Sequence, residues 1–284
     1  MKKSYILAIL LLAALTGCIG GGRTTETGPS FSGSGLAISL TVPQETAPST
    51  PVSILGYVKN MASENASDVS VYLQGLEGWN VQNALQTLSL LQPKDAYTFS
   101  WVAYSPSVTN KTYKPKVDVF YKMNTTASLK LRIYDNNYLE SLEQSKRDEI
   151  KKKSALLSFT NSTGTPVSIF IEIKQPFVLA YEKQEFPFII NIRNVGNGFV
   201  YSPTSDYRFL TVLTANQTVF DASSNYTLSC DVGNHALLQL GDSKAVACKI
   251  IAKRSEIVNY TDVAVELRLA YAYLYYVNAS IKVK

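Results

Sequence analysis

Alternation of apolar and polar residues dominates the chain after residue 36. The segments 36–42 and 167–173 place aliphatic side chains at every second position, and the segment 265–275 does the same with valine, leucine and tyrosine. Alternation of this kind predicts half-buried antiparallel strands. Turn residues separate the runs at short intervals, which is typical of a β-sandwich.

The chain also repeats itself. A first pair of alternating segments ends in an asparagine, Asn60 in one copy and Asn194 in the other. Two further pairs of matching segments follow in the same order in both copies. Each segment of the last pair is predicted to be a hairpin whose return strand ends its domain. The matched segments are 54–60 with 189–197, 90–101 with 238–250, and 116–133 with 266–283. The repeat predicts an all-β fold of two immunoglobulin-like antiparallel β-sandwiches in tandem.

A charged segment separates the two copies. Residues 138–153 are predicted to form a short helix, with Leu139, Leu142 and Ile150 roughly on one side. Because this apolar stripe is thin, the pattern favours a connector over a helix that binds a partner.

The start of the chain has a different pattern. Lys2 and Lys3 precede an apolar run at 6–15, which is too short to cross a bilayer, since a spanning helix takes about 20 residues. A basic start, a short apolar core and small residues indicate a secretory signal.

The residues Leu15, Thr16, Gly17 and Cys18 resemble the lipobox of a lipoprotein signal peptide. The resemblance implies that Cys18 carries a lipid thioether and begins the mature chain. An ordinary signal peptide that contains a cysteine is the alternative. A two-chain lipid is enough for stable anchoring, so we expect the protein on the extracellular face of the cytoplasmic membrane. Residues 20–35 are rich in Gly, Ser and Thr and are predicted to be a flexible tether with a reach of about 20–25 Å.

These patterns together predict the domain organisation. The predicted parts are a signal peptide at 1–17, lipidated Cys18 with its tether at 18–35, a first sandwich at 36–134, a charged connector at 135–163 and a second sandwich at 164–284.

Charge and cysteine content bear on whether the protein binds nucleic acid, forms a disulfide or holds a metal ion. The formal net charge is +5, and basic residues are scattered apart from Lys151, Lys152 and Lys153, which argues against a nucleic-acid partner because that needs a clustered basic face. Cys230 and Cys248 are the remaining cysteine pair and are predicted to form a disulfide in an oxidising exterior. A metal site is the alternative, but 17 residues between the cysteines with a single histidine is not a zinc spacing.

Eight N-x-S/T sequons are the strongest signal after the lipobox. In an exported chain they predict N-glycosylation, the alternative being a chance excess in a protein rich in Ser and Thr. Together with the lipobox they favour an archaeal exterior. The sequons are at Asn65, Asn110, Asn124, Asn161, Asn216, Asn225, Asn259 and Asn278.

Candidate catalytic residues are few. Gly241, Asp242 and Ser243 resemble a hydrolase nucleophile motif, and His235 is the one histidine that could act as a base. The motif occupies a turn position of the repeat, however, and these three residue types are good turn formers. We therefore expect no enzymatic activity and no cofactor.

Aromatic residues are the remaining candidates for binding. Tyr271, Tyr273 and Tyr275 alternate along one strand and are predicted to fill its core side, with stacking on a ligand as the alternative. Tyr276, on the opposite face, and Trp79, in a predicted loop or strand start, are the candidate exposed binding aromatics, with a place in the core as the alternative for Trp79.

The repeat resembles the immunoglobulin-like modules of microbial surface proteins, of the CARDB and NPCBM-associated kind. The resemblance rests on a strand that ends in Asn, a small residue, an outgoing strand and a Leu-Pro or Leu-Gly turn: Asn60 with Pro93, and Asn194 with Gly241. The first copy departs from the pattern because it lacks the glycine after the asparagine: Met61 and Ala62 stand where the second copy has Val195 and Gly196.

The resemblance implies a non-catalytic archaeal surface lipoprotein. Its modules would bind or scaffold at the cell envelope, with an envelope protein or a polysaccharide as partner and the membrane as its anchor through Cys18. An accessory binding subunit of a surface transporter, protease or glycosidase is the alternative. A stand-alone hydrolase is a third possibility.

Overall fold

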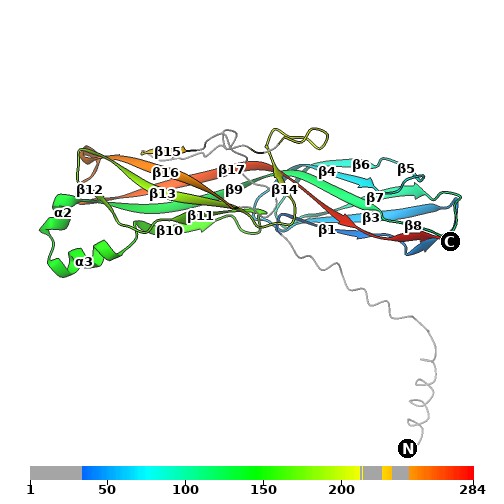
Figure 1. Ribbon diagram of the computed structural model, residues 1–284, viewed down its shortest axis with the longest axis horizontal. Helices are drawn as coiled ribbons and strands as arrows, with labels where there is room; N and C mark the ends of the chain where they lie inside the picture. The colour runs from blue at the N-terminus through cyan, green and yellow to red at the C-terminus, as the bar shows by residue number, and fades with distance from the viewer. Residues whose placement is uncertain (1–33, 212, 214–225, 232–242) are drawn as a thin grey trace, which may run out of the picture. The chain divides into compact units, whose positions relative to one another are not determined.

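The computed structural model describes residues 34–284 except 212, 214–225 and 232–242 (Figure 1). The predicted signal peptide, Cys18, Asn216, Asn225 and His235 lie outside the described residues. Residues Phe31–Lys284 form one compact unit. Strands dominate this unit, so the predicted all-β class is confirmed. Within the described part of the chain, no helix combines the length and the hydropathy needed to cross a membrane.

The elements run in chain order. The strands are β1 Leu36–Thr41, β2 Glu45–Thr46, β3 Pro51–Asn60, β4 Ala66–Gln74, β5 Asn80–Val81, β6 Leu85–Leu91, β7 Ala96–Tyr104, β8 Lys111–Tyr113, β9 Lys116–Asp135, β10 Leu156–Asn161, β11 Val167–Glu172, β12 Phe177–Leu179, β13 Lys183–Asn194, β14 Phe199–Tyr201, β15 Thr227–Asp231, β16 Ser243–Lys253, β17 Tyr260–Asn278 and β18 Ile281–Val283. The helices are α2 Asn136–Ser141, α3 Gln144–Lys152 and the 3₁₀ turn η2 Arg254–Glu256.

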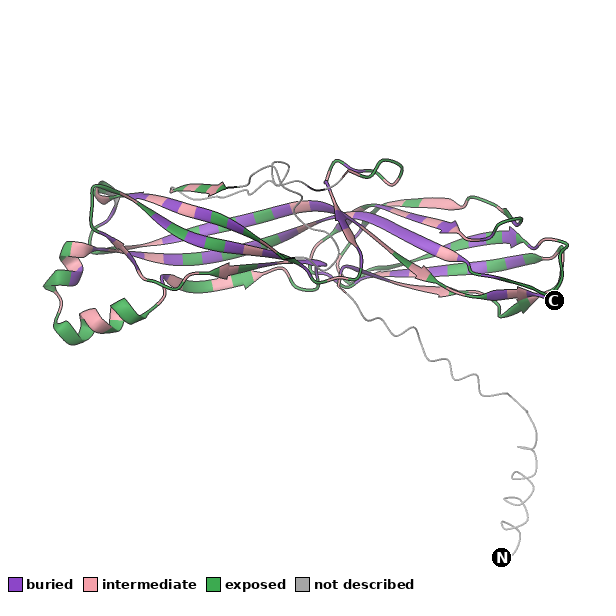
Figure 2. Ribbon diagram, in the orientation of Figure 1, coloured by how far each residue is buried: buried purple, intermediate pink, exposed green. Residues whose placement is uncertain are grey.

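Four sheets organise these strands. Two four-stranded sheets have the equivalent orders β1-β3-β7-β5 and β11-β13-β16-β15. A large sheet has the order β14-β17-β9-β4-β6, with β10 and β12 also paired to β9, and a small sheet has the order β2-β18-β8. The odd-numbered residues of β9 from Val117 to Ile133 are buried, so one continuous core runs along this face of the large sheet. Figure 2 shows the resulting alternation of buried and exposed bands along the long strands.

The predicted repeat is confirmed at the two strand-ending asparagines. Asn60 pairs with the first residue of β1, and Asn194 pairs with the first residue of β11. In both copies, the side-chain Oδ1 accepts a hydrogen bond from the backbone N–H two residues later, at 3.0 Å and 3.1 Å. In both, Nδ2 donates to the carbonyl oxygen four residues later, at 2.8 Å. Because Asn can satisfy a donor and an acceptor of a buried turn at once, it ends the strand in the same way in both copies.

The predicted hairpins at 116–133 and 266–283 are wrong. The first segment lies within β9, a single strand of 20 residues, and most of the second lies within β17, which pairs antiparallel with β9 from Tyr260–Tyr134 to Asn278–Lys116. The reason is visible at Asn124, Thr125 and Thr126, where the period-two burial pattern continues without a change of phase. Threonine favours a strand, and neither Gly nor Pro is present to turn the chain.

The β9–β17 ribbon carries strands across the boundaries predicted from the repeat. The N-terminal part of β9 pairs with β4, whereas its C-terminal part pairs with β10 and β12. At the other end of the ribbon, β18 pairs with β8 and β2, so the C-terminus completes the first half of the fold (Figure 1). Lys122 pairs with Ala272, its own counterpart in the repeat that aligns residue 116 with residue 266. The two halves therefore exchange their last strand segments about a pseudo-twofold centre.

The connector between the copies contains two helices. The predicted helix at 138–153 is interrupted between α2 and α3, and Leu139 is buried while α3 buries none of its residues. Asp135 caps α2, because its Oδ1 accepts hydrogen bonds from the backbone N–H groups of Asn137 and Tyr138 at 2.8 Å and 3.2 Å. The strand β10 also lies within the predicted connector.

Candidate functional site

Buried tyrosines occupy the centre of the ribbon, where the two halves meet. The Tyr273 hydroxyl accepts a hydrogen bond from the Gly198 N–H at 2.7 Å and donates to Asn194 Oδ1 at 3.2 Å. On the other strand, the Tyr121 hydroxyl accepts from the Leu36 N–H at 3.3 Å. The prediction that the alternating tyrosines fill the core is confirmed, since Tyr271 and Tyr273 are buried and Tyr275 is half-buried and packs against the core.

Burial decides the protonation of these phenols. Loss of solvent raises the pKa of Tyr273 to about 12 and raises the pKa values of Tyr121, Tyr271 and Tyr275 well above the ordinary value, because a low-dielectric site disfavours the phenolate. All four stay neutral at physiological pH. Tyr121, Tyr271 and Tyr273 serve as hydrogen-bonding groups of the core, whereas the Tyr275 hydroxyl is buried without a hydrogen-bond partner among the described residues. A Cβ on Gly196 would overlap the Tyr273 hydroxyl, so this position needs glycine.

A polar clasp joins the two halves beside this centre. The Glu64 Oε1 accepts hydrogen bonds from Ser162 Oγ at 2.6 Å and from Thr126 Oγ1 at 2.9 Å. The backbone of Ser63 donates to the Thr163 carbonyl oxygen at 2.9 Å. A pocket of about 540 Å³ lies over these residues. Since the Glu64 oxygen is already bonded to two hydroxyls of the fold, the clasp has the geometry of a structural contact between loops.

A second pocket, of about 610 Å³, lies in the second half where β11 ends. Phe177, Phe186 and Phe188 line it, and the Phe177 and Phe186 rings stack with centroids 4.8 Å apart. Of the charged residues that line it, Lys174 Nζ pairs with Glu172 Oε1 at 2.8 Å, and Glu185 Oε2 pairs with Lys249 Nζ, outside the lining, at 2.8 Å. Both carboxylates of the lining are held in ion pairs, and the rest of the lining is mostly apolar.

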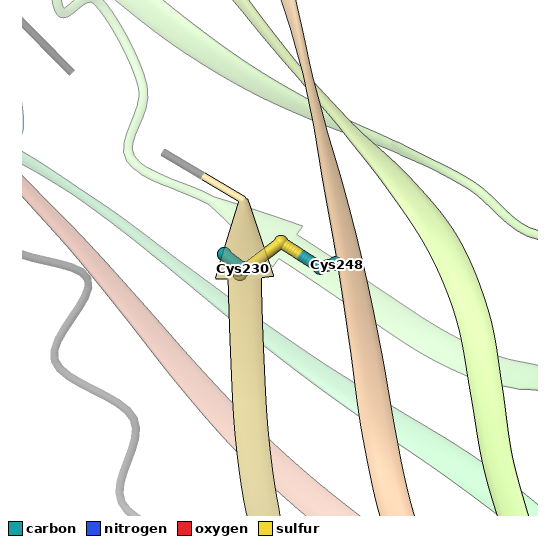
Figure 3. Close-up of a disulfide and its surroundings, with 2 residues drawn as sticks. All are labelled: Cys230 and Cys248. Atoms are coloured by element: carbon teal, nitrogen blue, oxygen red, sulfur yellow. A yellow bond between two sulfur atoms is a disulfide. The ribbon is translucent and has the colours of Figure 1, made fainter. Parts of the chain in front are cut away.

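The predicted disulfide between Cys230 and Cys248 is confirmed (Figure 3). The two cysteines lie directly opposite each other in the β15–β16 pair, with Cα atoms 4.0 Å apart. Of the candidate hydrolase residues, Ser243 begins β16 and is exposed, and its proposed base lies outside the described residues. Among the described side chains, no group of three His, Cys, Asp or Glu residues is placed to hold a metal ion.

The sequons within the described residues fall into two groups by exposure. Asn65, Asn110, Asn259 and Asn278 are exposed, and Asn110 and Asn259 occupy turns with φ of 57° and 66°. Asn124 and Asn161 are half-buried.

The two half-buried sequons sit in ordered structure. Asn124 lies within β9 opposite Ala270. The Asn161 Nδ2 donates to Ser168 Oγ and to the Ile169 carbonyl oxygen, both at 2.9 Å. N-glycosylation takes place at the side-chain nitrogen of asparagine. The two hydrogen bonds of Asn161 Nδ2 therefore oppose glycosylation of this residue in the folded chain.

The two predicted binding aromatics differ in exposure. Trp79 is only 8 % exposed and packs edge-on against Tyr113, with ring centroids 5.5 Å apart, so the prediction that it is exposed is wrong. Its loop folds back over the end of the first half and carries the ring into the core. Tyr276 is 52 % exposed, with the Lys116 ammonium 4.4 Å above its ring.

Sequence reasoning missed the outer face of the sheet β1-β3-β7-β5, which we call the neutral face. Lys59 is the only charged residue in these four strands. Three large side chains on this face, Leu55, Val102 and Tyr104, are 39–41 % exposed. The absence of charge in the segments 36–41, 51–60 and 96–104 was a usable signal, because an exposed sheet face normally carries polar and charged residues.

Comparison with known proteins gives little guidance. No family model matches the chain, and no curated protein matches it. Among solved structures, the chain has a distant similarity to the secreted serine protease VesC from Vibrio cholerae, with 8% sequence identity and a TM-score of 0.21. The match covers 85% of this chain and 51% of the other, so the chain spans about half the length of that protein. A similarity at this level carries no argument about function.

Proposed function

We propose that the chain is a non-catalytic, lipid-anchored protein of the cell exterior that presents two immunoglobulin-like modules as one rigid binding unit. Cys18 would hold it on the membrane, and the tether at 20–35 would let the unit reorient. The observation that carries the proposal is the β9–β17 ribbon, which runs unbroken through both halves.

The ribbon restricts the motion of the two halves relative to each other. Domains joined by a linker reorient freely unless their interface is large and apolar. Here two long strands and one continuous core belong to both halves, so bending between them would break strand pairs and expose buried side chains. A protein built in this way keeps its surfaces at fixed spacing, which suits a scaffold that positions an envelope protein or a polysaccharide.

Two further features support an exterior location. Disulfides persist in oxidising compartments, and Cys230 is bonded to Cys248. Four sequons are exposed on the folded unit, as glycan attachment requires. Neither feature depends on the lipobox, so they are independent support for export.

Intact-mass measurement of the native protein tests the anchor. We expect a mature chain that begins at Cys18 and carries the added mass of a two-chain lipid, and a Cys18→Ser variant that lacks this mass. The matched control is the double variant Cys230→Ser/Cys248→Ser, which removes the other two thiols and should keep the lipid. A native chain with an unmodified thiol at Cys18 contradicts the proposal.

Crosslinking on intact cells tests the binding role. The protein should be joined reproducibly to one envelope protein or polysaccharide. Recovery of substrate turnover by the purified chain, abolished by Ser243→Ala, would instead support the hydrolase alternative.

A further inference from the structure

The outer surface of the β9–β17 ribbon in the second half carries two facing rows of side chains, which we call the ribbon face. The rows are the even-numbered residues of β9 from Thr126 to Tyr134 and of β17 from Tyr260 to Arg268, and most of the odd-numbered residues between them are buried. The rows lie opposite each other, from the pair Thr126–Arg268 to the pair Tyr134–Tyr260. The face is therefore about 27 Å long, at about 3.4 Å per residue. The pocket of about 540 Å³ over the polar clasp hollows the end nearer the centre of the ribbon.

Two charged side chains at the hollowed end are left without a partner in the described part of the fold. Glu266 and Arg268 line the pocket and are exposed, and neither side chain makes an ion pair or a hydrogen bond with the described residues. Their equivalents in the repeat, Lys116 and Asp118, form an ion pair with each other at 2.8 Å. The ribbon face thus keeps one anionic and one cationic group open to a ligand, whereas the other copy of the repeat satisfies the same two positions internally.

An aromatic cluster forms the other end of the ribbon face. The centroid of the Tyr260 ring lies 6.0 Å from that of Tyr134 and 6.3 Å from that of Tyr138. The Arg132 guanidinium lies 4.3 Å from the Tyr260 centroid and is held by two hydrogen bonds to the Asp262 carboxylate, at 2.6 Å and 2.9 Å. Tyr260 still keeps 46 % of its surface in solvent, so the cluster presents a fixed aromatic surface to a ligand.

The charges of the ribbon face argue against a charged ligand. Together with Glu64, the face holds three acidic and three basic side chains, so its formal charge is zero and it does not attract a polyanion. These side chains are Glu64, Asp262, Glu266, Lys130, Arg132 and Arg268.

The side chains between the charges argue against an apolar ligand. In the two rows, no aliphatic residue is larger than Ala264, and the pocket lining adds hydroxyls such as those of Thr126, Ser128 and Thr160. An acyl chain or the apolar stripe of a helix therefore finds no matching surface. The ligand that fits is neutral, rich in hydrogen-bonding groups and able to cover an aromatic ring.

We propose that the ribbon face binds a neutral oligosaccharide. Sugar hydroxyls donate and accept hydrogen bonds at once, which suits a carboxylate beside a guanidinium. The C–H face of a sugar ring is apolar and packs against an aromatic side chain. A face of this length has room for several sugar units in a row, with hydroxyls at the Glu266 end and a ring on Tyr260. The inference rests on the proposed scaffold role and names the chemical class of its partner.

Two sources could supply this ligand, and both are close at hand. An envelope polysaccharide is one. The other is the glycan of the chain itself, because exposed sequons lie beside both ends of the face: Asn65 directly follows Glu64, and Asn259 directly precedes Tyr260.

Affinity measurements on the full-length chain, produced without glycans, test the site. One probe is the pool of neutral oligosaccharides released from the cell envelope, and the second is the pool released from the sequons of the native protein. The acidic oligosaccharides of the same envelope are the control. We expect a neutral pool to bind and the acidic pool not to bind, and the neutral pool that binds identifies the source.

Variants on β17 locate the binding. Tyr260→Ala and the double variant Glu266→Ala/Arg268→Ala should each weaken binding at least about 10-fold, because they remove the ring surface and the charged hydrogen-bonding groups. Tyr276→Ala is the matched control for the ring. Tyr276 lies on the same strand, is 52 % exposed and has the Lys116 ammonium 4.4 Å from its ring centroid, so this variant should keep full affinity.

A second control removes charges elsewhere. The double variant Glu185→Ala/Lys249→Ala deletes an exposed ion pair on another sheet and should bind as the natural chain does. Circular dichroism with thermal melting establishes that each variant is folded.

The outcomes separate this inference from the proposed function. Binding of a neutral pool that the ribbon-face variants weaken and both controls keep supports the inference. Absence of binding to both neutral pools, binding of the acidic pool of equal strength, or full affinity in the folded ribbon-face variants overturns it. None of these measurements depends on Cys18. A chain that carries the lipid and crosslinks to an envelope protein but binds no sugar leaves the proposed function standing without this site.

Discussion

Cutting the chain in α3 should leave its two pieces tightly bound to each other. The perturbation is a site for a sequence-specific protease placed in α3 and then cleaved. This helix buries none of its residues, so the cut itself removes no core contact. The N-terminal piece ends with β9 and α2, and the C-terminal piece contains β10 to β18.

The strand exchange determines the magnitude. Each piece inserts a strand segment into the half that the other piece mainly builds, and the buried apolar side chains involved are Leu129, Leu131, Ile133, Tyr271, Tyr273, Ile281 and Val283. Burial of one such side chain contributes about 1.5–3 kcal/mol, or about 15 kcal/mol for the set. The β9–β17 pairing, 19 residues long on β17, adds hydrogen bonds worth about 1 kcal/mol each.

These contacts predict that the pieces stay associated. Both the association cost of about 4–15 kcal/mol and the ordering of the exchanged segments oppose them, so the binding is the difference between large terms. Even so, the pieces should not separate at micromolar concentration without denaturant.

Native mass spectrometry is the assay, with a denaturing gel as the record of cleavage. The cleaved protein should keep the mass of the intact chain under native conditions and give two bands after denaturation. The disulfide cannot hold the pieces together, because Cys230 and Cys248 belong to the same piece. The uncut protease-site variant is the control. Cleaved pieces that separate in native buffer while each keeps its β-structure would refute the shared ribbon.

The described contacts support three further predictions. The free energy of unfolding should be unaffected by pH below about 10 and should fall as the pH rises above it, because the folded pKa values of Tyr121, Tyr271 and Tyr273 lie above the unfolded value. Each phenol contributes a slope of about 1.4 kcal/mol per pH unit. Circular dichroism and phenolate absorbance should record the loss together, and the Tyr271→Phe variant should show a shallower slope. Replacing both cysteines by serine should lower the free energy of unfolding by about 3 kcal/mol in urea titration, and reduction of the natural disulfide should have the same effect. In the native glycosylated protein, Asn259→Gln should remove one glycan from the intact mass, whereas Asn161→Gln should leave the glycan mass unchanged.

Several features of the candidate site were accessible from the sequence because they depend on local chemistry. The asparagines that end β3 and β13 act on backbone groups within four residues. The alternation of tyrosines in β17 reflects the period of a strand. Burial of Trp79 was not accessible, because its position beside Gly78 is compatible with either an exposed loop or a loop that folds over the core.

The neutral face shows a second limit on what the sequence alone can reveal. Its low charge, with Lys59 as its one charged side chain, is written in the sequence, but which of its residues share a face emerges only once the sheet β1-β3-β7-β5 is formed.

The sequence by itself determined that the chain is built mainly of strands, which face of several strands is apolar and where the two strand-ending asparagines recur, because these depend on the period of the backbone and on residues close together in the chain. Only the tertiary structure decided that β9 and β17 run past their own modules and pair with each other along 19 positions. A strand has the same two-residue period whichever strand lies beside it, so alternation carries no record of the partner. The choice is made by the free energy of the whole assembled core, in which each half is completed by a segment from the other.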